Sequence, residues 1–149
     1  GKKFPEPLRV VFTRTLNLPR IRNLWNCDLA KTLVVYDESS ADEKYLDSLP
    51  KCVELAKIPS DNPKFLSKLL AERGLNKVLW ECGPDLATSA IKNGCIQETI
   101  TFIAPKILGG VSSMTPFADF NYEDMNEVKI LNKDTIQILE NDICIRNSL

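Results

Sequence analysis

Short apolar runs alternate with helical patterns along the first two thirds of this chain. Residues 8–12 (LRVVF) and 32–36 (TLVVY) are rich in β-branched side chains and almost wholly apolar, which is typical of strands buried on both faces. Residues 52–58 (CVELAKI) alternate apolar with polar positions more closely, as a strand nearer the edge of a sheet does. Strands of this kind, separated by helical segments, predict an α/β domain with a parallel sheet.

The clearest helix is predicted over residues 61–73. Either Asp61 or Asn62 can cap its start, Pro63 suits its first turn, and Gly74 ends it. Its apolar residues recur at helical spacing, so we expect one side of this helix to face a sheet.

The next part of the chain predicts a strand, a helix and a second strand. Residues 77–81 (KVLWE) predict a short strand, a helix follows from about Pro84 to Asn93, and Gly94 stops it. Residues 99–104 (TITFIA) then predict another strand.

The C-terminal end predicts three short strands joined by turn-forming connectors. The strands are expected near residues 128–131, 135–139 and 143–146, with connectors at residues 132–134 (NKD) and 140–142 (END). Strands joined by connectors this short run antiparallel. The whole pattern predicts one α/β domain over residues 1–149, with a mixed, mostly parallel sheet flanked by helices and an antiparallel C-terminal end.

Composition and charge exclude several classes of function. The 149 residues include 19 Lys and Arg against 20 Asp and Glu, a net charge of −1 with no basic excess for a nucleic acid. The absence of histidine excludes a Ser-His-Asp triad, a histidine general base and the usual His-containing zinc sites. No apolar run approaches the ~20 residues of a membrane helix. We therefore expect a cytoplasmic protein with no metal and no nucleic-acid or membrane partner.

The cysteines agree with a cytoplasmic location. They are odd in number, far apart in the sequence and without a CxxC pair: Cys27, Cys52, Cys82, Cys95 and Cys144. This usage predicts thiols in a reducing compartment and not a disulfide framework.

The strongest candidate for chemistry is residues 78–86 (VLWECGPDL), where a predicted strand ends, a glycine turn follows and a helix begins with proline. The free backbone N–H groups of a helix start, with the positive end of its dipole, form a site for an anion such as a phosphate or pyrophosphate. Gly83, Asp85 and Leu86 would supply the donors, because Pro84 has none. A plain structural turn is the alternative, since many α/β proteins turn in this way with no ligand.

Glu81 lies within this stretch, at the carboxyl end of the predicted strand, where α/β sheets bind ligands. Its carboxylate can accept a hydrogen bond from a hydroxyl group of a substrate or of a cofactor sugar. It can equally well cap the neighbouring backbone, and the sequence favours neither role.

A second polar group follows the first predicted strand. Thr13, Arg14 and Thr15 come directly after LRVVF, and two hydroxyl groups with a guanidinium at the end of a strand can grip a phosphate through charge-assisted hydrogen bonds. A solvated turn that simply ends the strand is the alternative.

Three stretches together resemble the reductase domain of riboflavin biosynthesis, a member of the dihydrofolate-reductase-like fold. The first is PLRVVF at residues 7–12 with Thr13 and Arg14 after it, and the second is VLWECGPDL at residues 78–86. The third, FIAPKILGG at residues 102–110, is close to the family's IAPKLLGG stretch and is the most specific of the three. The likeness spans nearly the whole chain, including its last strands.

The resemblance implies an NADPH-dependent reductase. Its substrate would be the phosphoribosylamino-pyrimidine 5-amino-6-(5-phosphoribosylamino)uracil, whose ribosyl group becomes ribityl by direct hydride transfer to C1 of the sugar. Such a reaction needs no catalytic nucleophile and no metal, only a cofactor held in near-attack geometry against the substrate. A homodimer and, in the full-length protein, an upstream deaminase domain are also implied.

The resemblance also implies roles for particular residues. The Thr-Arg pair would hold the 2′-phosphate of NADPH, the glycine turn would hold the cofactor pyrophosphate, and Glu81 would contact the substrate. The implied cofactor site comprises Thr13, Arg14, Gly83, Pro84, Asp85, Leu86 and Ala87.

The chain departs from the family's pattern at three points. Cys82 replaces the first glycine of the family's Gly-Gly turn, and Asp85 stands where the family usually has threonine. The chain begins near the family's third strand, so the family's opening strand and the segment that binds substrate phosphate and nicotinamide have no counterpart before Gly1. We therefore expect a reductase domain without its N-terminal portion. The alternatives are a catalytically incomplete nucleotide-binding or assembly module, and a related reductase acting on another pyrimidine or pterin-like substrate.

Overall fold

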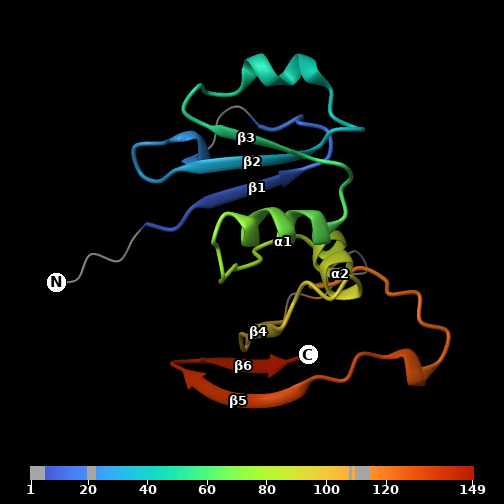
Figure 1. The fold of residues 1–149 in the computed structure, drawn as a ribbon. Helices are drawn as coiled ribbons and strands as arrows, with labels where there is room; N and C mark the ends of the chain where they lie inside the picture. Colours follow the sequence, from blue (N-terminus) through green and yellow to red (C-terminus); the bar gives the residue numbers. More distant parts are fainter. Residues whose placement is uncertain (1–5, 20–22, 108, 110–114) are drawn as a thin grey trace. The chain divides into compact units, whose positions relative to one another are not determined.

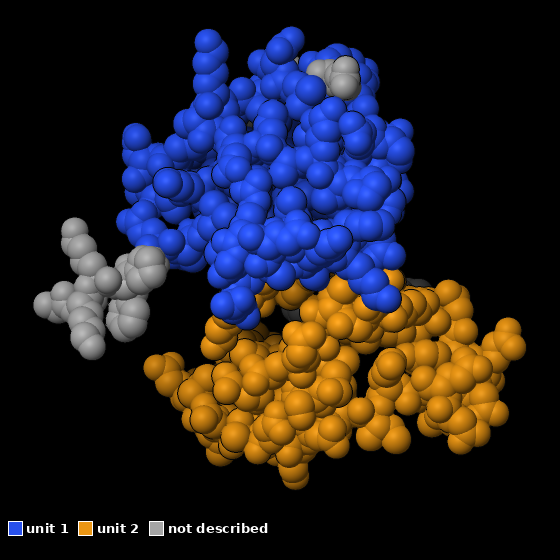
Figure 2. All heavy atoms as spheres, in the orientation of Figure 1, with its two compact units in different colours: residues 1–76 blue, residues 77–149 orange. Residues whose placement is uncertain are grey.

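The computed structural model describes residues 6–19, 23–107, 109 and 115–149, which fall into two compact units. Unit 1 comprises residues 1–76 and unit 2 comprises residues 77–149, coloured blue and orange in Figure 2. Unit 1 contains a parallel sheet and unit 2 an antiparallel sheet (Figure 1). None of the helices in the described part of the chain is long and apolar enough to cross a membrane.

The sheet of unit 1 has three parallel strands in the order β1-β2-β3, namely β1 (Arg9–Thr13), β2 (Thr32–Asp37) and β3 (Glu54–Ile58). All three were predicted, and β3 lies at an edge as its alternating pattern indicates. The prediction that β1 is buried on both faces is wrong. Only β2 is buried along its whole length, because it is the middle strand, whereas β1 is an edge strand and is half-buried.

One face of this sheet is covered by irregular chain and two short 3-10 helices, η1 (Asn23–Trp25) and η2 (Glu43–Ser48). The centre of this layer is a buried cluster of Leu16, Val34, Tyr36 and Val53. The side chains packed against it include Val11, Leu18, Trp25, Cys27, Ala41, Tyr45, Leu46 and Leu49. We call this the loop layer, because it contains no α-helix among the residues described.

The other face belongs to α1 (Pro63–Glu72). Side chains alternate along a strand, so Leu33 and Val35 of β2 point away from the loop layer. Helix α1 buries Pro63, Leu66 and Leu70, and Arg73 at its end forms a 2.6 Å ion pair with Glu54 at the start of β3.

The start and end of α1 agree with the prediction. The side chain of Asn62 caps the helix by accepting a 2.9 Å hydrogen bond from the N–H of Lys64, and Pro63 occupies the first turn. The chain leaves the helix through Gly74, whose φ of +78° is a conformation that suits glycine.

Unit 2 contains α2 (Pro84–Lys92), the 3-10 helix η3 (Met125–Glu127) and an antiparallel sheet in the order β4-β6-β5. Its strands are β4 (Glu98–Ile103), β5 (Asn132–Leu139) and β6 (Asp142–Ser148). A two-residue turn joins β5 to β6, with Glu140 at a φ of +56°. The predicted class, an α/β fold with an antiparallel C-terminal end, is confirmed. The described strands form two separate sheets, however, and not the single, mostly parallel sheet that was predicted, because the C-terminal strands pair with one another.

Two predicted strands of unit 2 are wrong. Residues 77–81 and 128–131 form no strand, because a strand needs a neighbouring chain to pair with, and no described segment pairs with either. The predicted connector at residues 132–134 belongs to β5 instead, where Asn132 and Lys133 pair with β6 and an irregularity before Thr135 accommodates the extra residue.

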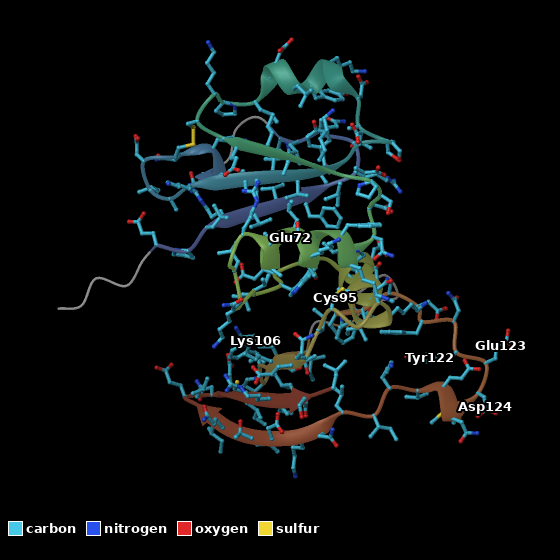
Figure 3. All side chains as sticks on the ribbon, viewed as in Figure 1. Glu72, Cys95, Lys106, Tyr122, Glu123 and Asp124 are labelled. Atoms are coloured by element: carbon cyan, nitrogen blue, oxygen red, sulfur yellow. A yellow bond between two sulfur atoms is a disulfide. The ribbon has the colours of Figure 1, made fainter. Side chains whose placement is uncertain are left out.

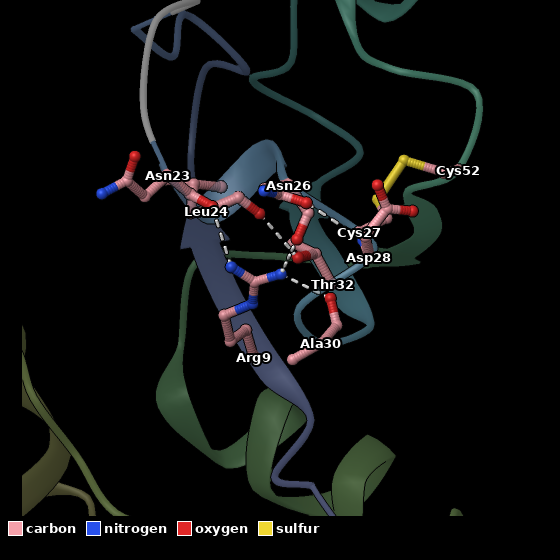
Figure 4. The surroundings of a disulfide bond; sticks show 9 residues. All are labelled: Arg9, Asn23, Leu24, Asn26, Cys27, Asp28, Ala30, Thr32 and Cys52. Atoms are coloured by element: carbon pink, nitrogen blue, oxygen red, sulfur yellow. Dashed lines mark hydrogen bonds between the residues drawn. A yellow bond between two sulfur atoms is a disulfide. The ribbon is translucent and has the colours of Figure 1, made fainter.

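The prediction that the cysteines are all thiols is also wrong, since Cys27 and Cys52 form a disulfide with their Cα atoms 6.3 Å apart (Figure 4). Cys27 precedes β2 and Cys52 precedes β3. Because β2 and β3 are parallel neighbours, their amino ends lie together, and this brings two cysteines 25 residues apart into contact. Cys82, Cys95 and Cys144 are free.

Candidate functional site

The carboxyl ends of β1, β2 and β3 meet at one edge of the parallel sheet, and a polar segment follows each strand (Figure 1). These segments are residues 13–15 (TRT), 38–40 (ESS) and 60–62 (SDN). Parallel α/β sheets bind ligands at this edge. The Thr-Arg pair predicted to bind phosphate therefore lies where such a ligand would be expected.

Arg14 carries a positive charge at this edge. Its side chain is 66% exposed, and its Nη1 lies 3.9 Å from Oδ2 of Asp61, just before α1. An exposed ion pair of this kind contributes about 1 kcal/mol or less, so a phosphate, which carries more charge, can displace Asp61 from the guanidinium. Asp61 thus lies within ion-pair distance of Arg14 but leaves the guanidinium exposed.

Leu16 holds the turn that presents Arg14. Its backbone has a φ of +61°, its side chain is 1% exposed in the loop layer, and its N–H donates a 3.3 Å hydrogen bond to Oγ1 of Thr13. A left-handed conformation costs a leucine about 1–2 kcal/mol, so it persists only where the surroundings enforce it. Burial of the Leu16 side chain therefore keeps Thr13 and Arg14 in this turn.

Sequence reasoning missed the segment after β2. Asp37 is buried, and its Oδ1 accepts hydrogen bonds from the N–H and the hydroxyl of Ser39, at 2.8 and 2.7 Å. The hydroxyl hydrogen bond from Ser39 is the main reason that the pKa of Asp37 lies below its usual value. Ser40 follows, with its Oγ 3.5 Å from that of Ser39. Two serines directly after a buried strand were a signal comparable to the Thr-Arg pair after β1.

The turn before α2 is the second candidate site. Gly83 caps the helix with a φ of −72° and no side-chain hydrogen bond, and Pro84 occupies the first turn. A Cβ at Gly83 would meet nothing within 4 Å, so no described atom crowds this point of the helix start. The N–H of Ala87 donates to the carbonyl of Gly83 at 3.0 Å and closes the first helical turn. Gly83, Asp85 and Leu86 come before Ala87, so their backbone N–H groups have no partner within the helix and can donate to an anion.

Three side chains set the charge at this turn. Glu81 and Asp85 are exposed. The carboxylate of Asp85, in the first turn, interacts favourably with the positive end of the helix dipole but repels a bound anion. Burial raises the pKa of the Cys82 thiol, so this residue stays neutral at pH 7 and adds no charge beside a phosphate. The Cys82 side chain therefore adds bulk to this turn and no charge.

The loop before η3 supports the start of α2. The N–H of Ala118 donates to the carbonyl of Pro84, and the hydroxyl of Thr88 donates to the carbonyl of Ala118, both at 3.3 Å. Lys92 of α2 lies 5.5 Å from the ring centroid of Phe120, which stacks on Tyr122. Figure 3 labels Tyr122 and the two acidic residues that follow it. The loop therefore fixes both ends of α2.

The structure thus groups the predicted residues by unit. Thr13 and Arg14 lie together in unit 1, and Glu81 and residues 83–87 lie together in unit 2. In the predicted FIAPKILGG stretch, Leu108 and Gly110 lie outside the described residues, whereas Gly109 has a φ of +63°.

The family model of the RibD C-terminal domain matches residues 1–145. The chain belongs to this family. The resemblance to the reductase domain of riboflavin biosynthesis is therefore confirmed, and the predicted dihydrofolate-reductase-like fold agrees with the solved structures of RibD and pyrimidine-reductase-like proteins that this chain matches.

Individual relatives agree with the family assignment. The chain is 41% identical over 122 residues to the riboflavin biosynthesis protein RibD of Synechocystis sp., covering 81% of this chain and 33% of that protein. It is 29% identical over 115 residues to the 2,5-diamino-6-ribosylamino-4(3H)-pyrimidinone 5′-phosphate reductase of Archaeoglobus fulgidus, covering 76% of this chain and 52% of that protein.

A solved deaminase/reductase from Thermotoga maritima shares the fold with a TM-score of 0.76 at 17% identity, covering 99% of this chain and 39% of that one. The chain thus spans about a third of the length of the RibD relatives it matches.

Proposed function

We propose that residues 1–149 act as one reductase-like domain in riboflavin biosynthesis. The domain would reduce the ribosyl group of 5-amino-6-(5-phosphoribosylamino)uracil to the ribityl group. The observation that carries this proposal is the family match over residues 1–145. The name of the Archaeoglobus fulgidus relative, a reductase of a ribosylamino-pyrimidinone 5′-phosphate, supports a substrate of this class.

NADPH, when bound, would supply the hydride for C1 of the sugar. The residues of the chain would bind the cofactor and the substrate and orient them toward each other, which is sufficient for direct hydride transfer. Thr13 and Arg14 would hold the 2′-phosphate. The exposed guanidinium and its weak ion pair with Asp61 support this role, because the pair can be exchanged for a phosphate.

The turn before α2 would hold the pyrophosphate. The open space at Gly83 and the backbone donors at the helix start support this assignment. The residues concerned are Gly83, Pro84, Asp85, Leu86 and Ala87. The exposed carboxylate of Glu81, next to this turn, would accept a hydrogen bond from a hydroxyl group of the substrate.

The proposed setting of this domain follows from its relatives. Two observations support an upstream deaminase domain in the full-length protein. The Thermotoga maritima relative is a deaminase/reductase, and this chain covers only about a third of the length of the RibD relatives. We also propose a homodimer in the reducing environment of the cytoplasm.

The cofactor assignment is tested by calorimetric titration with NADPH and with NADH. Arg14→Ala should weaken NADPH binding by about 1.5–3 kcal/mol and leave NADH binding nearly unchanged, because only NADPH carries the 2′-phosphate. Arg146→Ala is the matched control, since Arg146 also forms an exposed ion pair, 3.5 Å from Glu98, but lies in β6. An equal loss for both cofactors would reject the role of Arg14.

The reaction itself is tested by following the absorbance of NADPH on addition of the phosphoribosylamino-pyrimidine. Consumption of NADPH that depends on this substrate would support the reductase. Tight, NADPH-selective binding without any consumption would instead favour the catalytically incomplete nucleotide-binding module.

A further inference from the structure

The disulfide joins the two irregular connections that form the loop layer. The first connection runs from β1 to β2 and contains Cys27, and the second runs from β2 to β3 and contains Cys52. In their described parts, the only helices are the short 3-10 helices η1 and η2. Such helices have poorer hydrogen-bond geometry than α-helices and add little stability of their own. This layer therefore depends on side-chain packing and on the disulfide.

The first connection is fixed to the sheet independently of the disulfide (Figure 4). The guanidinium of Arg9 in β1 donates hydrogen bonds to the carbonyls of Asn23 at 2.9 Å, Asn26 at 2.5 Å and Ala30. The hydroxyl of Thr32 in β2 donates to the carbonyl of Leu24 at 2.8 Å. Opening the disulfide would therefore leave residues 23–30 of this connection on the sheet and release their covalent link to the second connection.

The loop layer is also what keeps Leu16 buried. Cys27 packs against the cluster that contains Leu16, and Val53, the neighbour of Cys52, belongs to that cluster. Leu16 holds its left-handed conformation only while its side chain stays enclosed, and its N–H bonds the hydroxyl of Thr13. A contiguous set of contacts thus connects the disulfide to the turn that displays Arg14.

We propose that the Cys27–Cys52 disulfide is a redox clasp for the turn at residues 13–16. When closed, it holds Leu16 buried and Thr13 and Arg14 in the binding conformation; when reduced, it lets the loop layer loosen and the affinity for a nucleotide phosphate falls. The effect on affinity rests on the cofactor site proposed above. In a reducing compartment, a disulfide of this kind is usually transient or redox-sensing and not a permanent structural link.

Opening requires a dithiol reductant. One thiolate of the reductant attacks Sγ of Cys52, the more exposed of the two residues, and forms a mixed disulfide. The bond to Cys27 breaks at the same time, and the Cys27 thiolate takes up a proton. The second thiol of the reductant, after losing its proton, attacks the mixed disulfide and releases Cys52, which is protonated in turn. The protein gains two electrons and two protons, and the reductant leaves as a disulfide.

Amide hydrogen exchange tests the clasp directly. On reduction with dithiothreitol, the amides of residues 13–18 should exchange roughly 5- to 10-fold faster, whereas those of β2 stay protected. Unchanged exchange at residues 13–18 would overturn the proposal. An equal loss of protection in β2 would also overturn it, because the disulfide would then support the whole unit and not this turn.

Cysteine variants provide the control for the reductant. Without reductant, the double variant Cys27→Ser/Cys52→Ser should reproduce the exchange pattern of the reduced protein. Cys144→Ser removes a free thiol of unit 2 and should match the oxidised wild type. If the double variant fails to fold, the comparison of oxidised with reduced wild type still decides the question.

Titration of both redox forms with NADPH separates this proposal from the proposed function. We expect binding to be roughly 5- to 10-fold weaker in the reduced form. Equal binding by the two forms would overturn the clasp and leave the cofactor site intact. Faster exchange at residues 13–18 with no NADPH binding by either form would reject the cofactor site and uphold the clasp's control of the turn.

Discussion

Replacing Leu16 by glycine should destabilise the protein less than replacing it by alanine, which reverses the usual order of these two substitutions. Both variants lose the branched part of a buried side chain from the loop layer, at a cost of about 2–5 kcal/mol, and glycine also lacks the Cβ that alanine keeps. At a φ of +61°, however, alanine must adopt a left-handed conformation that glycine adopts freely. We expect Leu16→Gly to be more stable than Leu16→Ala by about 0.5–1 kcal/mol.

Leu70 provides the matched control. Like Leu16 it is 1% exposed, but it lies inside α1. In a helix interior glycine costs about 1 kcal/mol more than alanine, so Leu70→Gly should be the less stable of the pair. The two sites have equal burial and opposite backbone preference, and the order of the variants should therefore be opposite.

The assay is urea denaturation followed by tryptophan fluorescence. The chain has 2 tryptophans, so a Trp80→Phe background leaves Trp25 as the reporter, and Trp25 packs against the cluster that contains Leu16. If glycine proves less stable than alanine at both sites, Leu16 is not held in a left-handed conformation. Burial of the Leu16 side chain would then not be what maintains the Arg14 turn.

Three further substitutions test the backbone conformations and charges of the structure. Asp37→Asn should lower the free energy of unfolding at neutral pH, and its difference from the wild type should shrink as the pH falls below 3.8. The hydrogen bonds from Ser39 lower the pKa of the folded Asp37 carboxyl below 3.8, so their contribution to stability is lost when this carboxyl is protonated. Urea denaturation across a pH series measures this, and a difference that is constant with pH would contradict it. Gly83→Ala should leave the free energy of unfolding unchanged within about 0.5 kcal/mol, since a Cβ there meets nothing. Gly94→Ala, at a φ of +68°, should cost about 1 kcal/mol in the same measurement, and equal costs would contradict the conformations assigned to the two glycines.

Local signals in the sequence predicted the helices well. The cap at Asn62, the prolines in the first turns and the glycines after the ends act within a few residues, so α1 and α2 begin and end close to where the sequence indicates. The three parallel strands were found for a similar reason, because β1 and β2 are dense apolar runs and β3 alternates apolar with polar positions. The wrong strands at residues 77–81 and 128–131 have the right composition but no described partner to pair with.

The sequence by itself determined the helix boundaries, the polar residues that follow β1 and the glycine turn before α2, and its motifs determined the family. The tertiary structure alone decided the left-handed conformation of Leu16, the ion pair of Arg14 with Asp61 and the disulfide between Cys27 and Cys52. Each of these joins residues far apart in the chain, or depends on a side chain enclosed by such residues. No local pattern encodes them, because they form only when parallel pairing of β1, β2 and β3 brings their ends together.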